Sequence, residues 1–243
     1  MAPELHWLDP TDPADSFPDP SQALVDPPGL LAVGGDLSVP RLLAAYRSGI
    51  FPWYQDDQPI LWWSPDPRAV LFPAELRISR SLRKTLRRCE YSVSVDQKFT
   101  GVIAGCAEDR DDPGTWITDD MLGAYEALHR SGHAHSVETW CDGELVGGLY
   151  GVNLGGVFFG ESMFSRRTDA SKVALVKLVS ICRSTGIELI DCQLASSHLA
   201  TLGSRQIARE EFQNLLRRYV SFPAPDGWAE PAVQTDEISV GSA

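Results

Sequence analysis

The sequence of 243 residues lacks several features that would assign it to a particular class of proteins at once. It has no uninterrupted run of about 20 apolar residues, which a membrane-spanning helix needs. Residues 1–4 have neither the basic nor the apolar region of a signal peptide. The five cysteines are scattered, and no Cys-x-x-Cys pair is present to hold zinc or a redox centre. We therefore expect a cytoplasmic protein with reduced cysteines, no membrane partner and no cofactor.

Positive charge is also scarce, since 21 Lys and Arg face 33 Asp and Glu, for a net charge of -12. Such a balance argues against a nucleic-acid partner, because binding to a polyanion relies on Lys and Arg. Residues 77–88 are an exception, since they contain six basic residues and no acid: Arg77, Arg80, Arg83, Lys84, Arg87 and Arg88. One basic face on an acidic protein is typical of a phosphate-binding surface. The alternative is a solvated helix face without a partner.

Hydrophobic residues make up 43% of the chain, which is enough to fill a core. The first part is rich in Asp-Pro pairs and is expected to form an extended arm. A short helix is expected between Ser38 and Gly49, followed by two aromatic strands at 50–54 and 60–64. A second region opens near Asp66. We predict a small N-terminal domain over 1–66, a main domain over 67–222 and a disordered tail over 223–243.

The main domain contains the sequence pattern of an antiparallel meander. Strands are predicted at 136–141, 144–152 and 157–161, with turns at 142–143 and 153–156. A long helix then starts at Asp169 or Ser171 and ends at Gly186, and a strand follows over 187–192. This order places Asp191 and Gln193 at the C-terminal end of a strand, where ligand-binding groups usually lie.

Acids and aromatic residues suggest a site in this part of the chain. Glu161 directly follows a predicted hairpin and lies among apolar residues. Asp191 and Gln193 lie at the end of the next predicted strand, which is apolar as well. Two carboxylates and an amide beside apolar residues are suited to a cationic group next to an apolar one. The alternative is that the acids are solvent-facing strand ends. Four tryptophans could either stack on a base or pack in the core: Trp53, Trp62, Trp63 and Trp116.

Other chemistries are disfavoured by the sequence. His129, His133 and His135 have a spacing that suggests metal ligands, but no acid or cysteine completes the set, and we expect no metal. Residues 160–164 lack the final glycine of a nucleophile elbow, which argues against a serine hydrolase. Residues 34–36 are not followed by Lys and Ser or Thr, so they form no P-loop.

Seven strings of the sequence resemble, in the same order, those of the leucyl/phenylalanyl-tRNA protein transferase family. They are 29–32 with 34–37, 49–53, 62–68 (WWSPDPR), 115–118, 132–136, 160–166 (GESMFSR) and 191–193 (DCQ). The resemblance covers about residues 29–212 of the chain. On these strings the chain is identified as a member of that family.

The resemblance implies an α+β architecture, in which a C-terminal domain of the acetyltransferase-like (GNAT) fold carries the small N-terminal α+β domain. It implies that Trp53 stacks on the 3′-terminal adenosine of tRNA and that Trp116 lines the same region. It also implies a pocket for an unbranched apolar side chain, formed by Phe158 with Leu149 and Leu178. The basic residues would contact tRNA phosphates: Arg83, Lys84, Arg87 and Arg88.

The reaction implied is the transfer of Leu, Phe or Met from aminoacyl-tRNA to proteins that begin with Arg or Lys, which marks them for degradation. An α-amine has a pKa of about 7.7–8.0, so it can attack the ester without strong base catalysis. Asp191 is expected to fix the Gln193 amide and to orient or deprotonate the amine, while Gln193 hydrogen-bonds the reacting centre. Glu161 is expected to bind the cation of the acceptor. We expect a monomer.

Two other functions compete with this interpretation. An acyl-CoA N-acetyltransferase of the same fold needs a pyrophosphate-binding loop, but the nearest string, residues 183–188, ends in the acid Glu188. A noncatalytic tRNA-binding module would explain the basic residues but not the placement of Asp191 and Gln193.

Overall fold

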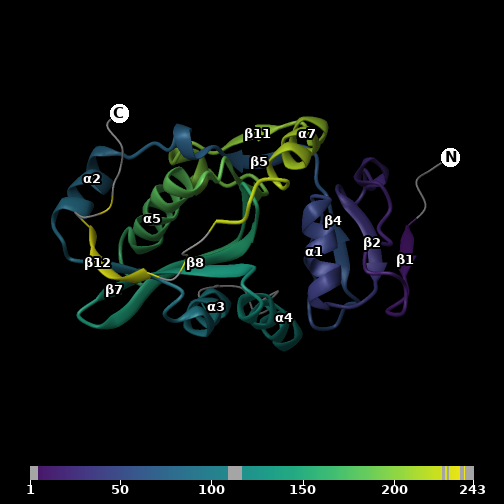
Figure 1. The fold of residues 1–243 in the computed structure, drawn as a ribbon, viewed down its shortest axis with the longest axis horizontal. Helices are drawn as coiled ribbons and strands as arrows, with labels where there is room; N and C mark the ends of the chain where they lie inside the picture. The colour runs from purple at the N-terminus through teal and green to yellow at the C-terminus, as the bar shows by residue number, and fades with distance from the viewer. Residues whose placement is uncertain (1–4, 109–116, 226–227, 229, 236–237, 239–243) are drawn as a thin grey trace.

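The computed structural model describes residues 5–108, 117–225, 228, 230–235 and 238, and it shows a mixed α+β protein with two sheets (Figure 1). The smaller sheet has the order β1 (His6–Leu8), β2 (Leu30–Gly34), β4 (Leu61–Trp63), β3 (Phe51–Pro52). The larger sheet has the order β11 (Arg205–Ile207), β5 (Arg68–Leu71), β10 (Leu189–Gln193), β9 (Val157–Ser165), β8 (Glu144–Leu154), β7 (Ala134–Cys141), β6 (Ser92–Val95), β12 (Glu230–Gln234). The α-helices are α1 (Val39–Arg47), α2 (Arg80–Arg87), α3 (Phe99–Glu108), α4 (Asp119–Arg130), α5 (Ala170–Thr185), α6 (Ser197–Thr201) and α7 (Arg209–Tyr219).

The smaller sheet confirms the predicted aromatic strands, because β3 and β4 pair antiparallel. The predicted short helix is α1, which has Pro40 in its first turn and is followed by Gly49 at a φ of 70°. Trp62 is fully buried and donates from its indole nitrogen to the carbonyl of Gly34, 2.8 Å away. The packing interpretation is therefore confirmed for Trp62.

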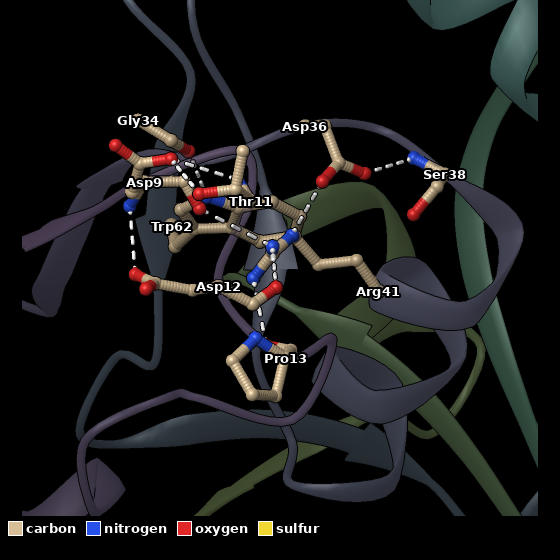
Figure 2. Close-up of polar contacts among 9 residues, drawn as sticks. All are labelled: Asp9, Thr11, Asp12, Pro13, Gly34, Asp36, Ser38, Arg41 and Trp62. Atoms are coloured by element: carbon tan, nitrogen blue, oxygen red, sulfur yellow. Dashed lines mark hydrogen bonds and ion pairs between the residues drawn. The ribbon is translucent and has the colours of Figure 1, made fainter.

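The N-terminal arm is held by one buried cation, Arg41 of α1 (Figure 2). Its Nε donates to the carboxylate of Asp36 at 2.9 Å. Its terminal nitrogens donate to the carbonyl oxygens of Pro13 at 3.3 Å, Asp12 at 2.9 Å and Asp9 at 3.4 Å. Proline-rich backbone has few N–H donors of its own, and a guanidinium with five donors can satisfy several of its carbonyls at once.

The predicted meander is confirmed as β7, β8 and β9, which pair antiparallel in that order. β9, α5 and β10 then form a strand, helix and strand unit with β9 and β10 parallel. This unit brings Asp191 and Gln193 to the C-terminal end of β10, as predicted. In the described part of the chain, no helix has the length and apolar character needed to cross a membrane.

Helices cover both faces of the larger sheet, with α5 on one face and α3 and α4 on the other (Figure 1). The core on the α3 and α4 side is continuous with that of the smaller sheet, since Leu42 and Tyr46 of α1 belong to the same cluster as Tyr125 of α4. The last residue of the smaller sheet is Trp63, and the first of the larger sheet is Arg68. The division into domains at residues 66 and 67 stays a prediction.

The described residues of the segment 223–243, expected as a disordered tail, include ordered structure. Part of it forms the strand β12, which pairs antiparallel with β6 at the edge of the larger sheet. Trp228 and Ile238 are buried, and the Thr235 hydroxyl donates to the Leu86 carbonyl at 2.7 Å. The high content of proline and acids suggested disorder, whereas Trp228, Thr235 and Ile238 are buried in the structure.

A β-bulge in β9 gives Glu161 its position in the sheet. Tyr150 pairs with Ser162 and Gly151 pairs with Gly160, so Glu161 is an extra residue without a partner across the ladder. Bulges of this kind redirect a side chain and increase the local twist. A Cβ atom at Gly151 would lie 2.1 Å from the carbonyl oxygen of Phe159, so the bulge requires glycine at this position.

We predict that Gly151→Ala destabilises the protein by at least about 1–3 kcal/mol, the usual effect of forcing an extra methyl into a packed site. Urea unfolding of the variant and the parent protein measures this difference. Gly123→Ala is the matched control, because Gly123 is an exposed residue of α4 with no atom within 4 Å of the added Cβ. That substitution should stabilise the helix by about 0.5–1 kcal/mol. Equal stabilities of the two variants would contradict the role given to Gly151.

Candidate active site

A cavity of about 380 Å³ lies between β8, β9, α5 and the end of β10. The three residues predicted for the apolar pocket, Leu149, Phe158 and Leu178, all line it. The other lining residues are Tyr150, Gly160, Glu161, Ser162, Met163, Leu175, Ile190, Asp191, Cys192, Gln193, Ser196, His198 and Leu199. The cavity is thus mainly apolar, with polar groups contributed by the middle of β9, the end of β10 and the start of α6.

A second cavity, of about 180 Å³, adjoins the smaller sheet and is lined by Phe51, Pro52, Trp53, Glu161, Cys192, Gln193 and Leu194. Trp53 is 40% exposed and packs against Trp63, whose indole nitrogen donates to the Trp53 carbonyl at 2.7 Å. Glu161 and Gln193 line both cavities. One carboxylate and one amide therefore stand between an apolar cavity and an aromatic one.

Asp191 forms a buried ion pair with Arg68 of β5. The Asp191 oxygens accept from Nε of Arg68 at 2.8 Å and from its Nη2 at 2.7 Å, and the side chains of Arg68 and Asp191 are 1% and 0% exposed. The guanidinium also lies over the rings of Phe51 and Phe212, at 4.8 Å and 4.6 Å from their centroids. Asp191 is therefore not a solvent-facing strand end, and both of its oxygens are engaged within the protein.

Gln193 is held at two points. Its backbone N–H donates to Oδ1 of Asp191 at 3.0 Å, at a shift in the pairing of β10 with β5, and its φ is 57°. Its side-chain Nε2 donates to Oε1 of Glu161 at 2.9 Å. The expectation that Asp191 fixes the Gln193 amide is wrong, because Asp191 fixes the backbone and Glu161 fixes the amide. The reason is that both carboxylate oxygens of Asp191 accept hydrogen bonds from the Arg68 guanidinium.

Glu161 accepts a second hydrogen bond on Oε2, from the Tyr125 hydroxyl at 2.7 Å. Burial raises the pKa of Glu161 to about 7, and the charge of Asp191 acts in the same direction. Hydrogen bonds from Tyr125, Tyr46 and Gln193 oppose this rise by stabilising the ionised form. The carboxylate can therefore change its charge near neutral pH, which is typical of functional groups.

The predicted tRNA-binding residues lie away from the two cavities. The basic residues of the tRNA prediction are exposed on α2 and directly after it, far from the smaller sheet (Figure 1): Arg83, Lys84, Arg87 and Arg88. Leu82 and Leu86 anchor the other side of this helix. Trp116 lies outside the described residues.

Two of the three histidines have structural partners. His129 stacks on Phe99, and its Nδ1 lies 2.8 Å from the carbonyl oxygen of Ala134. His135 is buried, and its Nδ1 lies 2.7 Å from a carboxylate oxygen of Asp96. Within the residues that the structure describes, no group of three or more His, Cys, Asp or Glu side chains could hold a metal ion.

Three site residues had no role assigned from the sequence: Arg68, Tyr46 and Tyr125. Arg68 belongs to the string 62–68, which contributed to the resemblance, but nothing local to that string points to Asp191. Tyr46 and Tyr125 lie on the buried faces of α1 and α4, where their spacing with apolar neighbours indicates core packing. Helical periodicity reports that a side chain is buried, but not what its hydroxyl bonds.

We predict that Arg68→Met destabilises the protein by about 3–5 kcal/mol, because it leaves the Asp191 carboxylate buried without its partner. Arg205→Met is the matched control, since Arg205 pairs with Glu75 at the surface, where the two side chains are 46% and 48% exposed. Arg205→Met should lower the free energy of unfolding by less than about 1 kcal/mol. Chemical denaturation measures both values, and a similar small loss in the two variants would show that the buried pair does not hold β5 against β10.

Comparison with known proteins identifies the family. A sequence model described as leucyl/phenylalanyl-tRNA protein transferase matches residues 70–217, and one described as the N-terminal domain of the same family matches residues 35–66. The leucyl/phenylalanyl-tRNA–protein transferase of Nitrosospira multiformis is 60% identical over 220 residues, covering 90% of this chain and 93% of that protein. That of Methylococcus capsulatus is 57% identical over 226 residues, covering 92% and 96%.

Solved structures give a weaker likeness. L-PGS from Bacillus licheniformis is 11% identical, with a TM-score of 0.39 over 68% of this chain and 53% of that chain. This score is too low to assign a fold, so the acetyltransferase-like fold stays a prediction. The sequence matches, by contrast, cover both regions of the chain at high identity, and the chain belongs to the leucyl/phenylalanyl-tRNA protein transferase family.

Proposed function

We propose that the protein is an aminoacyltransferase that moves Leu, Phe or Met from aminoacyl-tRNA to the α-amine of proteins beginning with Arg or Lys. Membership of the family supports the transfer of an aminoacyl group from tRNA to protein. The observation that carries the proposal is the position of Glu161, a single carboxylate lining both the apolar and the aromatic cavity. A donor with an apolar side chain and an acceptor with a cationic one meet at such a point.

The reaction is an aminolysis of the ester. The neutral α-amine of the acceptor attacks the carbonyl carbon, a C–N bond forms, and the C–O bond to the tRNA ribose breaks. The amine loses one proton and the ribose oxygen gains one, so the reaction needs no redox partner. Because the amine is already partly neutral at pH 7, alignment of the two substrates supplies much of the rate.

The donor side chain is assigned to the larger cavity. Phe158, Leu149 and Leu178 are 0%, 3% and 1% exposed and form an apolar wall. Transfer of an apolar side chain from water to this wall is favourable, whereas a charged or strongly polar side chain would lose its hydration. The 3′-terminal adenosine is assigned to the second cavity, where the exposed ring of Trp53 offers a stacking face. Trp116 is proposed for the same region.

The acceptor cation is assigned to Glu161. Each carboxylate oxygen can accept more than one hydrogen bond, so the bonds from Tyr125 and Gln193 leave capacity for a guanidinium or an ammonium. Hydrogen bonds between charged partners are about twice as strong as neutral ones, which favours Arg and Lys over neutral first residues.

Asp191 and Gln193 are proposed to divide the work of alignment. Gln193 donates one side-chain amide N–H to Glu161. We propose that it donates the other to the ester carbonyl oxygen as negative charge develops there. Asp191 is a positioning residue, since its carboxylate is enclosed and bound to Arg68 and to the Gln193 backbone. This assignment replaces direct deprotonation of the amine by Asp191.

The exposed cations of α2 are proposed to bind tRNA phosphates: Arg83, Lys84, Arg87 and Arg88. We also propose that residues 67–222 form an acetyltransferase-like domain, that the protein is cytoplasmic, and that it acts as a monomer.

An acyl-CoA donor is less consistent with the structure. The string at 183–188 would have to bind a pyrophosphate, but it lies in the last turn of α5 and beyond, with Gly186 as the C-cap. The C-terminal end of a helix carries partial negative charge and repels anions, whereas pyrophosphates bind at helix N-termini. In addition, Arg183 already donates to the Pro73 carbonyl from Nε and Nη2.

We expect the protein to transfer labelled leucine from Leu-tRNA to a peptide beginning with Arg, but not to the same peptide beginning with Ala. Scintillation counting of the purified peptide measures the transfer, and acetyl-CoA replaces Leu-tRNA in a parallel reaction. Acetylation without leucine transfer would overturn the donor assignment. Equal leucine transfer to the Arg and Ala peptides would keep the donor and overturn the acceptor assignment.

We predict that Glu161→Gln raises KM for Arg and Lys acceptors by about tenfold or more, since it replaces a charge-assisted bond with a neutral one. Steady-state kinetics with varied peptide and constant Leu-tRNA measure the effect. Glu75→Gln is the control, because it removes a surface carboxylate that lines neither cavity. Unchanged acceptor kinetics in Glu161→Gln would remove Glu161 from acceptor recognition.

A further inference from the structure

Two buried tyrosines stand behind the Glu161 carboxylate, and neither lines the apolar cavity or the cavity beside Trp53. We propose that Tyr46 and Tyr125 are positioning residues of the transfer reaction, which fix the Glu161 carboxylate and favour its ionised form without neutralising its charge. This inference rests on the proposed function, because it explains how Glu161 remains available to a cationic acceptor.

The direction of the hydrogen bonds follows from counting protons. The Tyr125 hydroxyl lies 2.7 Å from Oε2 of Glu161 and 2.6 Å from the Tyr46 hydroxyl. A hydroxyl has one proton to donate, and an ionised carboxylate has none. Tyr125 therefore donates to Glu161 and accepts from Tyr46, so the chain runs from Tyr46 through Tyr125 to the carboxylate. A hydroxyl that itself accepts a hydrogen bond is a stronger donor.

Packing fixes both rings. Tyr46 comes from α1 and lies against Phe159, with ring centroids 5.1 Å apart. Tyr125 comes from α4 and meets the edge of Tyr150, with centroids 5.4 Å apart. Both tyrosines are 0% exposed, and burial raises the pKa of each hydroxyl well above its usual value, with the Glu161 charge adding to the effect. They consequently remain protonated donors throughout the working range of pH.

The charges around Glu161 explain why neutral donors are needed. From β10 it faces Asp191, a like charge that is already paired with Arg68, and the Gln193 amide. From α1 and α4 it faces the tyrosines. Among the ion pairs of the described residues, none involves Glu161. A resident cation would cancel the charge that the acceptor must find, whereas hydroxyls stabilise the anion and leave its charge in place.

The sign of the effect can be tested because the two forms of Glu161 balance near neutral pH. Tyr125 and Tyr46 lower the pKa of the carboxyl, so loss of the Tyr125 hydroxyl raises it further. The ionised form is then lost at a higher pH than in the parent protein. Activity toward Arg acceptors should fall most at low pH and recover at high pH.

The experiment is the ratio of kcat/KM for an Arg peptide in Tyr125→Phe and in the parent protein, measured across pH. Titration of the peptide amine is common to both and cancels in the ratio. If the pKa of Glu161 rises by about one unit, the ratio at about pH 6 should be about tenfold below that at about pH 9. Tyr46→Phe should shift the ratio in the same direction by less, since Tyr125 lowers the pKa of Glu161 more than Tyr46 does.

Tyr91→Phe is the control for loss of a hydroxyl, because Tyr91 is also buried and donates to the Thr168 carbonyl at 2.9 Å, away from Glu161. Its ratio should not change with pH. A ratio that is independent of pH in Tyr125→Phe would overturn the proposal, since a merely structural role lowers activity at every pH alike.

A second measurement keeps the inference separate from the proposed function. Carbon NMR of protein labelled at the glutamate carboxyls follows the titration of Glu161, whose signal is identified by its loss in Glu161→Gln. A raised midpoint in Tyr125→Phe supports the hydrogen-bond role even if leucine transfer fails, and an unchanged midpoint overturns it. If Tyr125→Phe does not fold, the titration in Tyr46→Phe decides in the same way.

Discussion

The ion pair between Arg68 and Asp191 is the contact on which the geometry of the site depends. It joins β5 to β10, encloses both charges, and leaves Asp191 able to hold the backbone of Gln193 at the point where the ladder shifts. Transfer of two charges out of water costs several kcal/mol per ion, so such a pair is weak evidence for stability alone. Its consequence is geometric, because the same carboxylate binds the guanidinium of β5 and the Gln193 N–H and so ties the end of β10 to β5.

The two carboxylates of the site are stabilised in opposite ways. Asp191 forms an ion pair with Arg68 and has no exposed surface, so its charge is neutralised within the protein. Glu161 meets an amide and a chain of hydroxyls, which carry no net charge, and it lines both cavities. Neighbouring acids in different surroundings commonly have different roles. The first carboxylate positions the site, and the second remains able to attract a cation.

The sequence predicted the parts of this protein that arise from local patterns. Alternating residues and turn signals identified β7, β8 and β9, and helical periodicity with a terminal glycine identified α5. The order of these elements was enough to place Asp191 and Gln193 at a strand end. The partners of the buried polar groups were not predictable, because Arg68 and Asp191 are 123 positions apart and Tyr46 and Tyr125 are 79 apart. A long-range contact between polar groups leaves no periodic pattern in the sequence. The strand β12 was missed because the composition of residues 223–243 indicated a disordered tail.

The N-terminal region contributes three side chains to the candidate site and its surroundings. Tyr46 of α1 begins the hydrogen-bond chain to Glu161, Phe51 of β3 covers the Arg68 guanidinium, and Trp53 forms a wall of the second cavity. These residues lie within a few positions of one another, and the turn at Gly49 joins the helix to the strand. A shift of this short unit would therefore alter the surroundings of the Glu161 carboxylate, the cover of the ion pair and the position of the Trp53 ring at once. The N-terminal region is a structural part of the candidate site, since the larger sheet and its helices supply Glu161, Gln193 and Tyr125 but not Tyr46, Phe51 or Trp53.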